Sequence, residues 1–216
     1  MTQQKIDISL IEQRFIRTQD YANKNMMVIQ HREAKLFDAL PLVLDSILKV
    51  NARAVVKRNK LRDVALELNE KLKPYVACKP DCSHCCNIPV VITDYEAKRI
   101  SEATKTPYVE RPEGFITPRD MIKDDVADDF YRKNQSKYDR KPCPFLKENA
   151  CSIYDHRPMS CITHHSLDES NFFCQSSIPS ELSSVPSINF HYLHQFNAAI
   201  DLDFYMADIR DFFPNA

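Results

Sequence analysis

Residues 78–86 read Cys-Lys-Pro-Asp-Cys-Ser-His-Cys-Cys, a density of cysteine that decides what kind of fold the chain can have. The stretch places four thiols within nine residues, and Cys85 and Cys86 are adjacent. Thiolates are soft ligands that favour zinc, copper(I) or iron–sulfur clusters over calcium and magnesium. Because only short loops separate these cysteines, several sulfur atoms can face one centre. The stretch predicts a metal-binding segment.

A second group of cysteines follows at Cys143, Cys151 and Cys161, and the last of the eight cysteines is Cys174. None lies in the first 77 residues. A reducing cytosol keeps thiols free, which disfavours a disulfide framework. The neighbouring Lys, Asp, Ser and Arg side chains disfavour a set of inert thiols packed as small hydrophobes. The two groups together predict metal binding.

The identity of the metal stays open between zinc and an iron–sulfur cluster. A tetrahedral zinc ion and a cubane cluster each take four cysteines. The density of thiols favours iron–sulfur, whereas the histidines near them favour zinc; these are His84, His156, His164 and His165. Two adjacent cysteines strain to serve one small ion together, so Cys85 and Cys86 are expected to face different centres or to have different roles.

Three motifs occur in order: Cys-x-x-x-Cys-x-x-Cys-Cys at 78–86, Cys-Pro-Phe-Leu at 143–146 and Cys-x-Ile-Tyr-x-x-Arg-Pro-x-x-Cys at 151–161. They resemble the YkgJ-type cysteine-cluster family, described as a zinc- or iron-chelating domain. The resemblance implies metal ligands at Cys78, Cys82, Cys85, Cys86, Cys143, Cys151 and Cys161.

The same resemblance implies a cofactor-binding role for Arg157, whose guanidinium can donate hydrogen bonds to metal-bound thiolates. Ile162 stands where an arginine often follows the last cysteine of the family pattern. Cys174 lies outside the three motifs and is expected to be a spare thiol. No role can be assigned to the histidines from the sequence.

The section before the cysteines, residues 1–73, is predicted to be helical. Apolar residues at helical spacing follow Asp7, which is the expected N-cap. A second apolar stripe over residues 42–72 predicts a helical hairpin. Pro41 is expected at a helix start or just after a break, and residues 57–58 interrupt the stripe, which predicts a bend or an exposed turn there.

The remaining section, residues 74–216, is predicted to be a metal-stapled, cysteine-rich α domain with little strand. Pro74 is expected to end the helical section. The elements expected after it are an extended run at 88–92, a helix capped by Thr93 and Glu96 that buries Ala97, Ile100 and Ala103 and ends near Thr104, a loop at 105–120, an exposed helix at 124–139, a surface connection at 176–187 and a last helix at 189–213.

Composition excludes several functions. Gly114 is the only glycine, so neither a dinucleotide fingerprint nor a Walker phosphate loop can be present. The spacing of Cys78, Cys82 and Cys85 is also that of radical S-adenosylmethionine enzymes, but their β/α barrel needs glycine-rich strand ends. The net charge of −1, with acids and bases mixed, disfavours a nucleic-acid-binding zinc ribbon.

A cytoplasmic, mainly α metal-binding protein is therefore expected, with a metal ion as its partner and no membrane span, because no apolar run is long enough and no secretory signal opens the chain. The alternative is an iron–sulfur-dependent enzyme of redox or methyl-transfer type, since some proteins with a similar cysteine cluster are flagellin lysine methylases. The sequence does not decide between them, and it names no protein partner, substrate or oligomeric state.

Overall fold

The computed structural model describes residues 8–79, 82–175, 178 and 185–216, and within them the fold is mainly helical, as predicted. The α-helices are α1 (Ile8–Arg32), α2 (Ala34–Lys49), α3 (Ala54–Leu72), α4 (Asp94–Thr104), α5 (Asp124–Tyr138), α6 (Met159–Ile162), α7 (His191–Ile200) and α8 (Ile209–Phe212).

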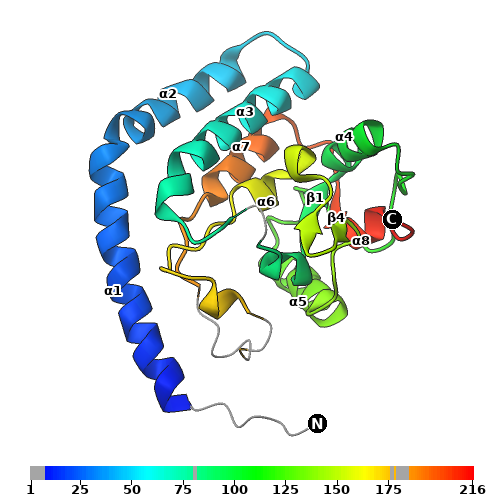
Figure 1. The fold of residues 1–216 in the computed structure, drawn as a ribbon. Coiled ribbons are helices and arrows are strands. Elements are labelled where there is room, and N and C mark those ends of the chain that lie inside the picture. Colours follow the sequence, from blue (N-terminus) through cyan, green and yellow to red (C-terminus); the bar gives the residue numbers. More distant parts are fainter. Residues whose placement is uncertain (1–7, 80–81, 176–177, 179–184) are drawn as a thin grey trace, which may run out of the picture.

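The other elements are short. Single turns of 3₁₀ helix form η1 (Lys73–Tyr75), η2 (His84–Asn87), η3 (Tyr154–His156) and η4 (Phe172–Cys174). Strand β1 (Val91–Thr93) pairs antiparallel with β4 (Met206–Asp208), and β2 (Leu146–Lys147) pairs antiparallel with β3 (Ala150–Cys151). Figure 1 shows α1 along one edge of the molecule and the β1–β4 pair on the opposite side.

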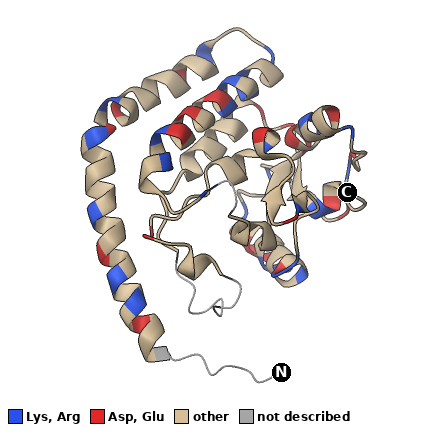
Figure 2. Cartoon of the chain, in the orientation of Figure 1, with Lys and Arg blue, Asp and Glu red and all other residues tan. Residues whose placement is uncertain are grey.

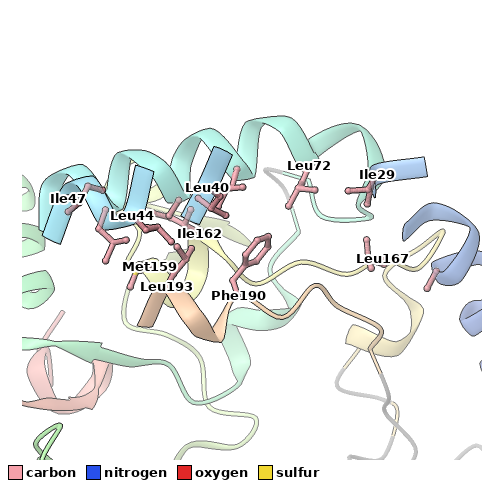
Figure 3. Close-up of a cluster of buried hydrophobic side chains, with 14 residues drawn as sticks. Ile29, Leu40, Leu44, Ile47, Leu72, Met159, Ile162, Leu167, Phe190 and Leu193 are labelled. Carbon is pink, nitrogen blue, oxygen red and sulfur yellow. The ribbon is translucent and has the colours of Figure 1, made fainter. Parts of the chain in front are cut away.

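One hydrophobic core lies between α2, α3, α6 and α7. The largest fully buried side chains in it include Leu44, Leu61, Leu68, Leu72, Ile162 and Leu193. Figure 3 shows Ile162 and Met159 of α6 pointing into the same cluster as Leu44 and Leu193. The burial of Ile162 gives a physical reason for the apolar residue after Cys161, because an arginine side chain there would place a charge in this core.

A second core packs around the β1–β4 pair, with α4 and α8 against it. Its buried residues are Val90, Ile92, Ala97, Ile100, Phe145, Ile153, Ala207, Ile209, Phe212 and Phe213. Cys143, Cys151 and Cys161 are half-buried against it. Because α6 contributes Ile162 to the first core and Cys161 to the edge of the second, Cys161 lies where the two cores meet.

The predicted start of α4 is confirmed. The hydroxyl of Thr93 accepts a hydrogen bond from the backbone N–H of Glu96 at 3.2 Å, and the Glu96 carboxylate accepts one from the N–H of Thr93 at 2.9 Å. Such a capping box satisfies two backbone donors at a helix start. The helix ends at Thr104, but Ala103 is exposed rather than buried as expected, because it faces away from the core.

Several other expectations hold within small shifts. The helical section ends before Pro74, residues 105–120 form a loop, and the extended run is found at 91–93. The charged helix α5 is present and buries Phe130 and Tyr138 on one face. Asp7 and most of residues 176–187 lie outside the described residues.

The predicted last helix over 189–213 is wrong. Helix α7 ends at Ile200, and the chain then forms β4 and the short α8. Strand β4 is held by its pairing with β1, in which Ile92 faces Ala207. The carboxylate of Asp201, the residue that follows α7, forms an ion pair with Arg58 Nη2 at 3.0 Å. Pairing across the fold outweighs the helical spacing of the apolar residues.

The predicted bend at residues 57–58 is also misplaced. The break between α2 and α3 lies at residues 50–53, where Val50 and Arg53 have extended backbone. Lys57 lies inside α3 and donates a hydrogen bond to the carbonyl oxygen of Leu48 at 2.6 Å, which satisfies a free group at the end of α2. Pro41 lies inside α2 instead of starting or breaking a helix.

Charges of both signs alternate along α1 and α3, as Figure 2 shows. No described helix is long and apolar enough to span a bilayer. The boundary proposed between residues 73 and 74 stays a prediction; the first core contains buried side chains from both sides of it.

Candidate metal centre

The cysteine-rich loop is shaped by its own backbone hydrogen bonds. The N–H of Cys82 donates to the carbonyl of Lys79 at 2.9 Å, and the N–H of Cys86 donates to that of Ser83 at 3.0 Å. The N–H of Cys143 donates to the carbonyl of Cys86 at 2.7 Å. This last bond joins the two cysteine groups that are far apart in the sequence.

A buried ion pair reinforces this junction. The Arg210 guanidinium pairs with Asp208 at 2.9 Å and donates to the carbonyl oxygens of Cys86 at 3.3 Å and Pro142 at 3.1 Å. Asp208 is fully buried and also accepts from the N–H of Val90 at 2.7 Å. Burial raises the pKa of the Asp208 carboxyl, while Arg210 opposes that shift. The pair positions both cysteine loops.

Sequence reasoning missed Asp208 and Arg210. The side chain of Asp208 caps α8 by accepting from the N–H of Arg210 at 2.9 Å, but the continuous helix expected over 189–213 left no place for a cap there. No sequence spacing relates Arg210 to the loops at Cys86 and Pro142, which lie much earlier in the chain.

The first thiol group consists of Cys78, Cys82 and Cys174. Burial raises the pKa of Cys174 to about 12, and the neighbouring Cys78 and Cys82 thiols raise it as well. Ser166 donates from its N–H to the Cys78 sulfur at 3.3 Å, and its hydroxyl lowers the pKa of Cys174 against the effect of burial. Cys174, expected to be a spare thiol, therefore lies with the predicted ligands. The sequence gave no indication of this relation, because Cys174 belongs to none of the three motifs.

The second thiol group consists of Cys143, Cys151 and Cys161. Burial raises the pKa of Cys143 to about 11. The pKa of Cys161 is raised by burial first and then by the thiols of Cys85, Cys143 and Cys151. The β2–β3 pair supports this group, because Cys151 lies opposite Leu146 and the N–H of Leu146 donates to the carbonyl of Cys143 at 3.0 Å.

Cys85 lies between the two groups. Its pKa is raised by a hydrogen bond with the Cys86 thiol and by burial. The Cys85 thiol in turn raises the pKa of Cys78 and Cys174 in the first group and of Cys151 and Cys161 in the second. The adjacent cysteines therefore stand at the junction of the groups.

Arg157 lies beside the same junction. Its positive charge lowers the pKa of Cys78, Cys85, Cys151 and Cys161, acting against burial. The guanidinium stacks 3.7 Å above the ring of Tyr154, and its Nε donates to the Tyr154 carbonyl at 3.0 Å. A cation fixed in this place favours the thiolate form of cysteines from both groups.

Helices α3 and α4 hold the segment that carries Arg157. Arg62 donates to the carbonyl of Asp155 at 2.6 Å, and Arg99 donates to the carbonyls of His156 at 2.9 Å and Arg157 at 3.1 Å. Glu96 accepts from the N–H of Met159 at 2.7 Å. The helical part of the fold thus positions the chain between Cys151 and Cys161.

The histidines near the cysteines differ in role. His165 is buried, and its Nε2 is 3.1 Å from the Asn69 side-chain oxygen. Burial lowers the pKa of His165 to about 4, so it is a neutral packing residue at pH 7. His164 is exposed and lines a cavity of about 390 Å³ with His191 and His194. His84 begins η2, and the exposed His156 ends η3.

All eight cysteines fall within the described residues, and there each is a free thiol. Among those residues, no three His, Cys, Asp or Glu side chains lie in an arrangement that could hold an ion as they stand. The donor set nonetheless suits zinc or iron–sulfur, because its members are soft, half-buried thiols beside a fixed cation. Binding would have to draw the sulfur atoms together.

Comparison with known families agrees with this donor set. Residues 77–177 match the CxxCxxCC family, described as "Putative zinc- or iron-chelating domain". The predicted kinship with a cysteine-cluster family is confirmed, and the matched segment extends past the three motifs to include Cys174. The chain matches no curated protein and no solved structure.

Proposed function

We propose that the CxxCxxCC domain holds two thiolate-ligated centres, either zinc ions or iron–sulfur clusters, that stabilise its loop-rich part. The observation that supports this proposal is the division of the thiols into two groups with Cys85 and Cys86 at their junction. Each group has three cysteines, and a zinc ion or a cubane cluster takes four. One of the adjacent cysteines completes each set.

The raised pKa values of the cysteines bear on how the centres form. Cys143 and Cys174 are protonated at pH 7 in the absence of metal, since burial raises the pKa of Cys143 to about 11 and that of Cys174 to about 12. Metal binding requires thiolates and therefore releases protons. Arg157 offsets part of the negative charge that the bound thiolates bring to the junction.

A structural or sensing role follows from the local architecture. The segments that carry the cysteines contain only two- to four-residue elements, namely η2, β2, β3, η3, α6 and η4. Such segments bury little apolar surface of their own, and a bound metal contributes its binding free energy to folding when the site does not exist in the unfolded chain. The bound metal would supply the stabilisation that a hydrophobic core provides elsewhere in the fold.

The proposal is tested by purifying the protein without oxygen and measuring its visible spectrum, zinc, iron and acid-labile sulfide. Two metal centres per chain are expected. Cys82→Ser should lose the first centre and Cys151→Ser the second, whereas Ser83→Ala, in the same loop as Cys82, should lose neither. Folded, metal-free protein with intact thiols that takes up neither zinc nor iron and sulfide would overturn the proposal.

An iron–sulfur enzyme is the second candidate, and the 390 Å³ cavity favours it. The cavity is lined by Ser160, Thr163 and His164, so it adjoins the helix that carries Cys161. An enzyme needs such a space for substrate beside its centre. Iron with labile sulfide that undergoes reversible reduction would support this candidate, and zinc alone would exclude it.

A further inference from the structure

Three arginines line a small cavity between helices α3 and α4 (Figure 1). Arg58 and Arg62 lie four residues apart on α3, which places them on one face of that helix, and Arg99 lies on α4. The cavity has a volume of about 20 Å³, which is room for one water molecule or one oxygen atom of an anion. Among the described residues that line it, only Glu96 is acidic. The cavity is therefore rich in positive charge.

Arg62 and Arg99 lie next to each other because they bind consecutive carbonyl groups. Nη2 of Arg62 donates to the carbonyl oxygen of Asp155 at 2.6 Å, and Nη2 of Arg99 donates to that of His156 at 2.9 Å. Burial lowers the pKa of Arg99, and the charge of Arg62 lowers it further. A carbonyl oxygen accepts a hydrogen bond but carries no net charge, so these bonds leave the repulsion between the two guanidiniums in place.

The carboxylates near the cavity do not neutralise these charges. No described carboxylate forms an ion pair with Arg62 or Arg99. The Glu96 carboxylate accepts hydrogen bonds from two backbone N–H groups at 2.9 and 2.7 Å, and its charge offsets only part of the positive charge beside it. Asp201 forms an ion pair with Arg58 at 3.0 Å. Three arginines against two carboxylates leave one positive charge without a counter-ion among the described residues.

Both guanidiniums also keep donors that no described residue accepts. Arg62 and Arg99 are half-buried, and the Nε of each is buried without a hydrogen-bond partner in the described part of the chain. Their Nη1 atoms have no partner there either. A guanidinium carries five N–H donors, and a buried donor without an acceptor costs free energy. An anion at this cavity would supply acceptors and a counter-charge together.

We propose that the cavity between α3 and α4 binds a phosphate group through Arg62 and Arg99. A tetrahedral phosphate offers acceptor oxygens to two guanidiniums at once, whereas one arginine already satisfies both oxygens of a carboxylate. The proposal goes beyond metal binding, since no cysteine lines this cavity.

The size of the cavity limits how the ligand is held. The space admits one phosphate oxygen, so the other oxygens and any group that bears the phosphate lie outside it. The ligand is therefore inorganic phosphate or the terminal phosphate of a larger molecule. Neither source needs a glycine-rich phosphate loop, because the arginine side chains supply the donors.

Arginine modification by phenylglyoxal, read residue by residue with peptide mass spectrometry, tests the proposal on the natural protein. Inorganic phosphate should slow modification of Arg62 and Arg99 by about fivefold or more relative to chloride at equal ionic strength. Acetate should slow it by less than about twofold, because a carboxylate engages one guanidinium. Arg132, on α5 with a side chain that is 73% exposed, is the control in the same sample and should react equally in all three salts.

Variants then measure the contribution of each guanidinium by calorimetric titration with inorganic phosphate. Arg62→Gln and Arg99→Gln should each weaken phosphate binding by about tenfold or more, since each removes one of the two charged donors. Lys60→Gln is the matched control: it removes the same charge from an exposed position of α3 outside the cavity, and affinity should change by less than about twofold. Titration with O-phosphoserine separates the two sources, because tighter binding than that of inorganic phosphate assigns the phosphate of a larger molecule.

Three results would overturn the proposal. Phosphate that protects Arg62 and Arg99 no better than chloride does, or no more than it protects Arg132, would show that the cavity has no affinity for it. Unchanged phosphate affinity in folded Arg62→Gln and Arg99→Gln would exclude both residues as ligands. Circular dichroism establishes folding, because these arginines also hold backbone carbonyls. Should both variants unfold, the protection measured in the natural protein decides.

Discussion

The helical part of the molecule and its cysteine-rich part are stabilised by different means. In α2, α3 and α7, side chains such as Leu44, Leu68 and Leu193 are buried at helical spacing against one another. In the cysteine-rich part, short turns are tied together by backbone hydrogen bonds and by the Arg210–Asp208 pair.

This difference shows why the chain needs both parts. Burial of apolar surface stabilises long amphipathic helices without any bound group. Short loops bury too little and carry many polar backbone groups, so they depend on specific polar contacts or on metal. The helical part in turn supports the cysteines through Arg62, Arg99 and α1.

Removal of metal should produce the largest difference in stability between the helical part and the cysteine-rich part. A chelator is expected to abolish hydrogen-exchange protection at residues 82–87 and 143–162, because metal binding contributes on the order of 10 kcal/mol to folding in small zinc domains. Amides of α2 and α3 should keep their protection. Mass spectrometry of exchanged peptides measures both, and equal loss in the two parts would contradict the comparison.

Breaking the ion pair that joins the cysteine loops should have the next largest effect. Asp208→Ala leaves Arg210 without its buried partner and frees the N–H of Val90, so the free energy of unfolding should fall by about 3–5 kcal/mol. Metal affinity of the second group should fall with it. Asp203→Ala is the control, since the Asp203 side chain is 89% exposed and should change stability by under about 0.5 kcal/mol in urea unfolding.

A cavity in the helical core should act on stability alone. Leu193→Ala removes a fully buried side chain, which should cost about 2–5 kcal/mol in chemical unfolding. Metal content per folded chain should stay unchanged, because Leu193 packs among the apolar side chains of the first core. Leu42→Ala, at a position that is 74% exposed, serves as the matched control. Loss of metal in Leu193→Ala would show that the core and the site are coupled.

A smaller effect is expected from pH. Burial lowers the pKa of His165 to about 4, below its ordinary value of 6.5, so the folded state disfavours the protonated ring. The unfolded chain binds this proton first as pH falls, and stability due to the neutral ring is lost between pH 6.5 and 4. At pH 5 the loss should be about 2 kcal/mol. Metal-free His165→Gln should show a correspondingly shallower decline than the natural chain; an equal decline would exclude His165, and the exposed His156→Gln provides the control.

The sequence predicted correctly those elements that are stabilised by contacts between residues close together in the chain. Thr93 and Glu96 lie three residues apart and cap α4 through their own side chains, so the start of that helix was readable from four residues. The apolar residues of 202–212 also have helical spacing, yet the chain there forms β4, because β1 offers a partner strand more than 110 residues away. Periodicity does not report such a partner.

The candidate site likewise contains residues that short motifs identify and residues that only the folded structure reveals. Three short motifs identify seven cysteines and Arg157, and the structure brings these residues around one junction. Cys174 and the Arg210–Asp208 pair could not be found in this way, since their contacts join segments with no shared spacing.

The sequence by itself determined the chemistry of this protein: soft thiol donors in a characteristic order, a single glycine that excludes phosphate loops, and amphipathic helices before them. Only the tertiary structure decided which thiols influence one another and that α1 packs against Phe173, the residue before Cys174. The physical reason is that donor chemistry belongs to individual side chains, whereas grouping depends on burial and pairing between segments that meet only when the chain folds.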